Sequence, residues 1–169
     1  MRKFEKISFE QFKKDVCDNK ELYDKIELPK RGTSYSAGYD IKSVEAGVIK
    51  PHSSHVFKTG IKAAMNNDEV LYIYVRCSMG FKYDVGLSNM VGVIDADFYN
   101  NPENEGHIAI KLYNHGENDY IVNIGDRIGQ GVFMKYLTVD DGEEVKTKRT
   151  GGFGSTNKKE DKKWNYMMI

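Results

Sequence analysis

The sequence predicts an all-β fold, either a β-sandwich or a barrel, and two observations support this prediction. Beyond residue 40, short stretches rich in β-branched and aromatic residues alternate with glycine, asparagine and other turn residues. The pattern also lacks the alternation of strands and helices that is typical of nucleotide-binding α/β folds. A length of 169 residues, 40% of them hydrophobic, is sufficient for one domain with its own core.

An N-terminal helix is expected before the strands, over residues 8–23. Ser8 can cap its first turn, and Phe9, Phe12 and Val16 recur at the spacing of one helical face. A proline and two glycines then interrupt the pattern. We therefore expect one short helix that leans on the body of the fold.

The strand predictions rest on residue type and on alternation. The strongest is Val70–Arg76, because most of its residues are β-branched, aromatic or otherwise apolar. In the last predicted strand, Gly129 and Gly131 indicate close approach of neighbouring groups to the backbone. The expected strands are 55–65, 70–76, 90–98, 106–114 and 126–137.

The balance of formal charges excludes one class of partner. The chain has 25 basic and 25 acidic residues, whereas a long nucleic-acid footprint needs a basic excess. We therefore expect no nucleic-acid polymer as a partner. A small phosphorylated ligand remains allowed, because it needs only a few local cations and backbone amides.

Cysteine usage and apolar runs indicate a cytosolic protein. Cys17 and Cys77 form neither a disulfide framework nor a zinc-binding pattern. The charged N-terminus lacks the apolar region of a signal peptide, and no apolar run approaches the length of a membrane span. We expect no membrane association.

The histidines do not predict a metal site. His52 and His55 lie near a turn without a third ligand, and His107 and His115 are isolated in the sequence. Any divalent cation is therefore expected to be held by phosphates and carboxylates, which are the ligands that Mg²⁺ prefers.

The stretch "KRTGGFGSTN", residues 148–157, combines glycines, hydroxyls and one aromatic ring. The glycines would let the chain wrap a ligand, and Ser155 and Thr156 could donate to phosphate oxygens. Phe153 could stack on a base, which is worth roughly 1–3 kcal/mol per base. A Walker loop has a strand before it, a lysine within it and a helix after it, and residues 150–157 have none of these. A flexible linker with a stray aromatic residue explains it equally well.

Four other stretches place polar residues at turns or strand ends. In "RCSMG", Arg76 is followed by a hydroxyl and a glycine, which suits an anion but also suits an ordinary strand exit. In "NMVGVIDADF", Asp95 ends an apolar strand, where a partly shielded carboxylate can orient or deprotonate water. Gln130 in "GDRIGQ" could donate to phosphate, and Asp40 in "AGYD" is also compatible with a simple turn.

Together, these five stretches resemble the five motifs of the homotrimeric dUTPases, in the same order over residues 37–156. The N-terminal extension and the tail resemble those of dUTPases from bacteriophages of Gram-positive bacteria, staphylococcal ones especially. The resemblance implies a distorted, jelly-roll-like β-barrel within residues 1–147 and a mobile C-terminal arm over residues 148–169. It also implies a homotrimer in the host bacterial cytosol, with active sites shared among subunits.

The implied reaction is the hydrolysis of dUTP to dUMP and pyrophosphate with Mg²⁺. The resemblance makes Asp95 the base that positions water on the α-phosphorus, and it makes Asp40 hold waters of the Mg²⁺ shell. Asn89 and the neighbouring backbone would read the uracil edge, and Phe98 would pack on the deoxyribose and exclude a ribose 2′-hydroxyl. The other implied substrate contacts are Arg76, Ser78, Gly80, Gln130, Lys148 or Arg149, Phe153, Ser155 and Thr156.

Four positions depart from the family pattern. Cys77 replaces a serine, and a thiol is a weaker donor than a hydroxyl. Phe98 replaces a tyrosine and keeps only the ring. Residues 99–104 are inserted into the third motif as a surface loop that could serve a partner. The arginine of the fifth motif is represented by Lys148 or Arg149, and the sequence does not distinguish them.

Two alternatives remain open at the level of sequence. A dCTP deaminase shares the fold, although the aspartate of "GVID" and the stacking arm favour the diphosphatase. A purely protein-binding regulator is the other, because staphylococcal phage dUTPases are implied to bind repressor proteins of mobile genetic elements. The candidate surfaces are the loop 99–105, the N-terminal helix and the tail, and the two roles do not exclude each other.

Overall fold

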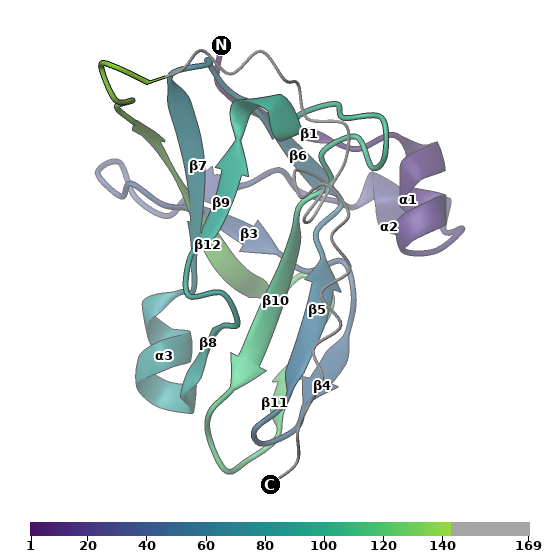
Figure 1. Ribbon diagram of the computed structural model, residues 1–169. Coiled ribbons are helices and arrows are strands. Elements are labelled where there is room, and N and C mark those ends of the chain that lie inside the picture. Colours follow the sequence, from purple (N-terminus) through teal and green to yellow (C-terminus); the bar gives the residue numbers. More distant parts are fainter. Residues whose placement is uncertain (143–169) are drawn as a thin grey trace, which may run out of the picture.

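The computed structural model describes residues 1–142, and it confirms the mostly β fold, with short helices at the edges of the sheets (Figure 1). The strands are β1 (Lys3–Lys6), β2 (Lys30–Arg31), β3 (Tyr39–Lys42), β4 (Gly47–Ile49), β5 (Ser54–Lys58), β6 (Ile61–Ala64), β7 (Glu69–Tyr74), β8 (Val85–Leu87), β9 (Gly92–Asp95), β10 (Ala109–Asn114), β11 (Tyr120–Val122) and β12 (Arg127–Lys135). The helices are α1 (Phe9–Asp15), α2 (Lys20–Asp24), α3 (Cys77–Tyr83) and the 3-10 helix η1 (Ala96–Phe98).

The strands form one large sheet and three smaller groups. The large sheet has the order β2-β3-β12-β7-β9, and a second sheet has the order β5-β10-β8. The pairs β1-β6 and β4-β11 complete the arrangement. Every one of these pairings is antiparallel. Through residue 142, these hydrogen-bonded orders do not close into a barrel.

One apolar core joins the two larger sheets. Leu71 and Ile73 of β7 are buried in the same cluster as Phe57 of β5 and Ile110 and Leu112 of β10. Each such side chain contributes about 1.5–3 kcal/mol through its removal from water. The core therefore fixes β7, whose two ends carry the residues considered below.

Glycines in β12 allow this close packing, as the sequence predicted. A Cβ added at Gly129 would lie 3.0 Å from Cδ1 of Ile110, and one added at Gly131 would lie 3.0 Å from Cδ1 of Leu71. Ile110 belongs to the other sheet and Leu71 to the neighbouring strand β7, and both separations are tighter than most real Cβ contacts, so a larger residue at either glycine would make these neighbours shift. The expected strand over residues 55–65 is split into two, because Gly60 turns the chain with a φ of 70°.

The N-terminal prediction of one helix over residues 8–23 is wrong in its extent. The Oγ atom of Ser8 accepts a hydrogen bond from the backbone nitrogen of Gln11, so the predicted cap is present, and Phe12 is buried. Asn19 then caps a second helix by accepting from the backbone nitrogen of Leu22 at 2.9 Å. Asn19 favours a new helix start over continuation, because its short polar side chain competes for nearby amides.

The strand predicted over Val70–Arg76 ends at Tyr74, and the helix α3 that follows was not predicted. Within α3 only Met79 is buried, and Gly80 lies inside the helix, so the sequence offers little helical periodicity. The helix ends where Asp84 adopts the left-handed conformation. Among residues 1–142, the helices are all too short or too polar to cross a bilayer.

The sequence indicated an isolated His107, but in the structure this residue is buried and both of its ring nitrogens form hydrogen bonds. Its Nδ1 lies 2.6 Å from Oδ2 of Asp15, and its Nε2 accepts a hydrogen bond from the backbone nitrogen of Gly60 at 2.9 Å. Because Nε2 accepts, Nδ1 carries the proton and donates it to Asp15. Burial lowers the pKa of His107 despite the opposing effect of Asp15, so the ring is neutral at pH 7.

This buried imidazole makes stability depend on pH. In the unfolded chain a histidine titrates near pH 6.5, about its ordinary value, whereas the pKa of folded His107 is lower. The unfolded state therefore binds more protons between the two values, so stability is complete above about pH 6.5 and is lost as pH falls through the folded pKa.

We expect the melting temperature of the wild type to fall more steeply than that of His107→Gln between about pH 7.5 and pH 5, because glutamine cannot gain a proton. Differential scanning calorimetry at matched ionic strength measures both slopes. Parallel slopes for the two proteins would exclude His107 as the titrating group.

Candidate active site

Two arginines meet on one carboxylate at the end of the large sheet. Asp40 on β3 accepts a hydrogen bond from Nε of Arg76 at 3.0 Å through Oδ1 and one from Nη1 of Arg127 at 3.1 Å through Oδ2. Strand pairing sets Gln130 opposite both Asp40 and Tyr74. Motifs that are far apart in the sequence therefore converge at this end of β7.

These arginines border a cavity of about 460 Å³, which we call the arginine cavity. Arg76, Ser78 and Tyr120 line it together with Arg127 and Asp126. The guanidinium groups supply fixed donors, which suits an anion with several oxygens. Two of the predicted substrate contacts, Arg76 and Ser78, therefore line the same cavity.

Gln130 and the glycine of "AGYD" fit against each other. Nε2 of Gln130 donates to the carbonyl oxygen of Val75 at 3.1 Å. A Cβ at Gly38 would lie only 2.3 Å from Oε1 of Gln130, so any larger residue would displace this amide. Gly80 and Cys77 are exposed on α3, and a Cβ at Gly80 would meet no atom within 4 Å. The structure thus leaves the predicted phosphate contact of Gly80 untested.

A second cavity lies beside the turn that joins β8 to β9 and has a volume of about 620 Å³; we call it the turn cavity. Apolar side chains such as Ile73, Ile94 and Ile110 line it, and Ser88 and Asn89 contribute polar groups from the turn. Its size and mainly apolar lining are typical of a small-molecule site. Asn89 is exposed, so its amide is available to a ligand at the turn.

Asp95 ends β9, is partly buried, and occupies the N-cap position of η1. Phe98 closes that short helix and is buried, with 4% of its surface exposed. The predicted pair of Asp95 and Phe98 is therefore held by a single turn of helix.

Asp95 and Arg76 lie at opposite ends of the same part of the sheet. Asp95 pairs with Val70 at the beginning of β7, whereas Arg76 follows the other end of that strand. Six residues of extended chain span about 20 Å. Figure 1 shows α3 at one end of β7 and the turn after β9 at the other. In one copy of the chain, the predicted site residues therefore form two separate groups, which we call half-sites.

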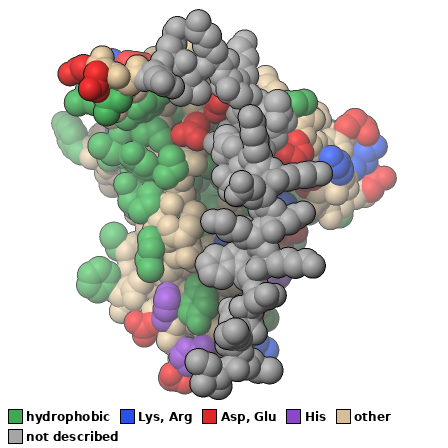
Figure 2. Space-filling view, in the orientation of Figure 1, with side chains coloured by type: hydrophobic (Ala, Val, Ile, Leu, Met, Phe, Trp, Pro, Cys, Tyr) green, Lys and Arg blue, Asp and Glu red, His purple; other side chains and the backbone are tan. Residues whose placement is uncertain are grey.

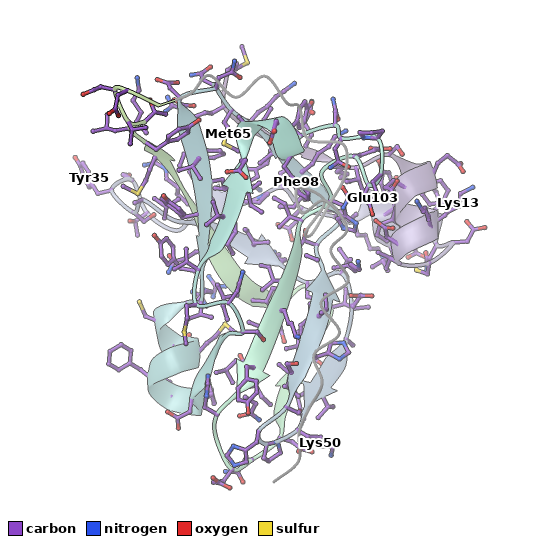
Figure 3. All side chains as sticks on the ribbon, viewed as in Figure 1. Lys13, Tyr35, Lys50, Met65, Phe98 and Glu103 are labelled. Carbon is purple, nitrogen blue, oxygen red and sulfur yellow. The ribbon has the colours of Figure 1, made fainter. Side chains whose placement is uncertain are left out.

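The inserted loop 99–105 is less available to a partner than the sequence indicated. Asn101 is buried and donates to the carbonyl oxygen of Phe98 at 2.8 Å. Lys14 of α1 donates to the carbonyl oxygen of Glu103 at 3.3 Å. Figure 3 shows Glu103 beside α1, so one side of the loop packs on the N-terminal helices.

Arg127 is the site residue that sequence reasoning missed, although it lies in "GDRIGQ". Arg127 and Gln130 would face opposite sides of a regular strand because they are three residues apart. A register shift between Arg127 and Gly129 sets Arg127 opposite Lys42 and Gln130 opposite Asp40, so both face the same side. Only the glycine at this bulge hinted at the irregularity.

Five predicted substrate contacts lie beyond the part of the chain that the structure describes, as does the arm over residues 148–169. They are Lys148, Arg149, Phe153, Ser155 and Thr156. Their assignment stays a prediction from the sequence.

Comparison with known proteins agrees with this arrangement of motifs. A model of the dUTPase family matches residues 24–157. The chain belongs to the dUTPase family. It is 47% identical over 132 residues to the deoxyuridine 5′-triphosphate nucleotidohydrolase of Lactococcus lactis, which covers 78% of this chain and 88% of that relative. The enzyme of the same name from Paramecium bursaria Chlorella virus 1 is 36% identical over 141 residues, covering 81% and 94%.

Solved dUTPase structures share the fold. The Streptococcus mutans dUTPase matches with a TM-score of 0.68 and 41% identity, covering 81% of this chain and 98% of that one. The dUTPase from phage phi11 of Staphylococcus aureus matches with a TM-score of 0.65 and 20% identity, covering 87% and 97%. The expected likeness to staphylococcal phage dUTPases is therefore found in the fold.

The shared carboxylate of Asp40 should also stabilise the protein. We expect Asp40→Asn to lower the free energy of unfolding by about 1–2 kcal/mol, because two charge-assisted hydrogen bonds lose their charged acceptor. Urea denaturation measures the change. Asp68→Asn is the matched control, since Asp68 pairs with Lys135 where both side chains are mostly exposed. Equal effects of the two substitutions would contradict a special role for Asp40.

Proposed function

We propose that this chain is a dUTP diphosphatase that hydrolyses dUTP to dUMP and pyrophosphate. The observation that carries the proposal is the division of the site on a dUTPase-family chain. Asp95 lies at one end of β7 and Arg76 with Arg127 lies at the other, while the turn cavity extends along β9 between them. A mainly apolar cavity and a cavity bordered by two arginines are the two environments that a nucleoside triphosphate needs.

The turn cavity would bind the nucleoside. Asn89 and the backbone of its turn offer donors and acceptors for the uracil edge, and the apolar lining offers contact area for the ring. Phe98, which follows Asp95 by three residues and is buried, would set the space available to the sugar, as the motifs imply. This arrangement favours a deoxyribose, which lacks the 2′-hydroxyl.

The arginine cavity would bind the triphosphate. Asp40 holds Arg76 and Arg127 in place before a ligand arrives, so their donors need little reorganisation. Ser78 lines this cavity and adds a donor without charge, and Gln130 is the further phosphate contact that the motifs imply. Phosphoryl transfer depends mostly on such positioning and neutralisation.

Asp95 would act on the attacking water. Its carboxylate accepts a proton from the water while the water oxygen bonds to the α-phosphorus and the bond from that phosphorus to the bridging oxygen breaks. Pyrophosphate leaves with the electrons of the broken bond. The partly buried position of Asp95 at a strand end keeps the carboxylate in a defined orientation.

Magnesium fits this site as an ion held mainly by the triphosphate. Both oxygens of Asp40 already accept from arginines, so this residue can contribute through water and not as a direct ligand. Residues 1–142 contain no group of three or more side chains arranged to ligate a metal. When bound, Mg²⁺ would neutralise charge on the phosphate oxygens.

We infer that a second copy of the chain completes each site and that the assembly is a homotrimer, as the motifs imply. The separation of about 20 Å is too long for one substrate contact to bridge within a copy. Figure 2 shows hydrophobic side chains gathered over β7, β9 and β12. Large apolar residues exposed on these strands and just after them include Val93, Met134, Leu137 and Val139. Such a surface is typical of subunit contact.

The contribution of the C-terminal arm, residues 148–169, to the proposed site rests on the sequence alone. Phe153 would stack on the uracil, and Ser155 and Thr156 would donate to phosphates. Either Lys148 or Arg149 would reach the γ-phosphate.

A repressor protein as partner, and a location in the host cytosol, stay predictions from the resemblance. Phage dUTPases such as that of Staphylococcus bacteriophage 80alpha, which matches at 19% identity and a TM-score of 0.63, control transfer of virulence genes. A pull-down with and without dUTP tests for a nucleotide-dependent partner of this chain.

Asp95→Asn tests the proposed chemistry. We expect turnover of dUTP to fall by roughly 10²–10⁴-fold, because asparagine cannot accept the proton, while dUTP binding and assembly are kept. A pyrophosphate-release assay across all deoxynucleoside triphosphates, with calorimetry for binding, measures both effects. Retained turnover would remove Asp95 from the mechanism, and formation of a uracil product from dCTP would favour a deaminase.

Complementation tests the shared site. Asp95→Asn and Arg76→Ala should each be inactive alone, because each damages one half-site. After the two variants are mixed in equal amounts and refolded together, we expect activity to return to about a quarter of the wild-type level, the share expected for random trimers. If every site were built within one copy, the mixture would stay inactive.

A further inference from the structure

The N-terminal segment, residues 1–23, lies outside the stretch matched to the family, yet it contacts the loop that follows Phe98. The carboxylate of Glu105 accepts from the backbone nitrogen of Ser8 at 2.9 Å and from Oγ of Ser8 at 2.5 Å. On the same loop, the hydroxyl of Tyr99 donates to the carboxylate of Glu5. The segment therefore holds both ends of the loop.

A lysine from the body of the fold joins this network. Nζ of Lys62 donates to Oδ1 of Asn100 at 2.6 Å and lies 3.3 Å from Oε2 of Glu105. Burial raises the pKa of Glu105, but hydrogen bonds from Ser8 and Lys62 more than offset it, so its pKa lies below the ordinary value. Glu105 is therefore a charged acceptor with three donors on it, and such bonds are the stronger kind.

The loop needs this support because its backbone is strained. Asn100 and Glu105 have φ values of 55° and 58°, in the left-handed region that non-glycine residues rarely adopt. Within the loop, the backbone nitrogen of Asn100 donates to the carbonyl oxygen of Glu105 at 2.9 Å. Contacts from outside the loop must offset the remaining strain, and Glu105 receives three of them, two from Ser8 and one from Lys62.

The far end of the loop returns directly onto Phe98. A Cβ at Gly106 would lie 2.5 Å from the carbonyl oxygen of Phe98, and the side chain of Asn101 donates to that same oxygen. Gly106 immediately follows Glu105. A shift of Glu105 therefore moves backbone that touches Phe98, three residues from Asp95.

We propose that Glu105 is a positioning residue that sets the selection of deoxyribose over ribose. It ties the loop to Ser8 and Lys62, and the loop fixes Phe98. This inference rests on the proposed function, in which Phe98 packs on the sugar. Rejection of the ribose 2′-hydroxyl requires that Phe98 stay in place to within about 1 Å, since displacements of that size already change rates strongly. Loss of the contacts of Glu105 with Ser8 and Lys62 should therefore change kcat/KM for UTP and for dUTP by different factors.

The test compares kcat/KM for dUTP and UTP in Glu105→Ala, Glu105→Gln and the wild type. We expect Glu105→Ala to lower the dUTP/UTP selectivity ratio roughly tenfold through a gain for UTP relative to dUTP. Glu105→Gln keeps an acceptor for Ser8 and should recover part of the ratio. The matched control is Glu10→Ala on α1, because the Glu10 side chain is 79% exposed and pairs with Lys13 on the same helix.

A merely structural role predicts a different result, namely equal losses for both substrates and an unchanged ratio, which would overturn the proposal. An equal effect of Glu10→Ala would overturn it as well. If Glu105→Ala does not fold, Lys62→Met provides the second variant, with a smaller fall in the ratio expected and an unchanged ratio counting against the proposal.

Binding separates this inference from the proposed function. Calorimetry with the non-hydrolysable α,β-imido analogues of dUTP and UTP gives the selectivity ratio without turnover. A wild type that prefers the deoxy analogue but does not hydrolyse dUTP would overturn the diphosphatase and leave the ratio in Glu105→Ala to decide this inference. A wild type that hydrolyses dUTP without that preference would overturn this inference and leave the diphosphatase in place.

Discussion

The antiparallel pairing of β7 with β12 and β9 is the constraint on which the rest of the structure depends. β12 sets Gln130 opposite Tyr74, and β9 sets Asp95 opposite Val70. A slip of one residue in either pairing would turn every side chain of that strand to the other face. The buried side chain of Ile128 on β12 opposes such a slip, because the slip would expose it to water. Core packing and the geometry of both half-sites therefore share one cause.

Charge is distributed so that each half-site is prepared before substrate arrives. At one end, Asp40 offsets the mutual repulsion of Arg76 and Arg127, and it does so where the arginines are only partly exposed. At the other end, charged groups support the loop behind Phe98 through Glu105 and Lys62. At each end a carboxylate, Asp40 or Glu105, accepts hydrogen bonds from several donors, which limits the motion of the neighbouring residues.

Local rules predicted the features that depend on neighbours in the sequence. The cap at Ser8, the close approach at Gly129, and the strand that ends in Asp95 each follow from residue type and spacing. Long-range contacts escaped prediction, because no spacing rule connects Asp15 to His107 or Ser8 to Glu105. The bulge that turns Arg127 toward Asp40 escaped for a related reason. The bulge changes which side of the sheet Arg127 faces, and its position depends on the partner strand, which a single sequence does not specify.

The contact between Gly38 and Gln130 gives two nearby glycines opposite tolerance to change. A methyl group at position 32 would meet open space, whereas one at position 38 would occupy the place of the Gln130 amide oxygen. A side chain at position 32 therefore has room, while at position 38 even the smallest side chain would push aside the amide that donates to the Val75 carbonyl oxygen. The absence of a side chain at Gly38 thus leaves the space that Gln130 occupies.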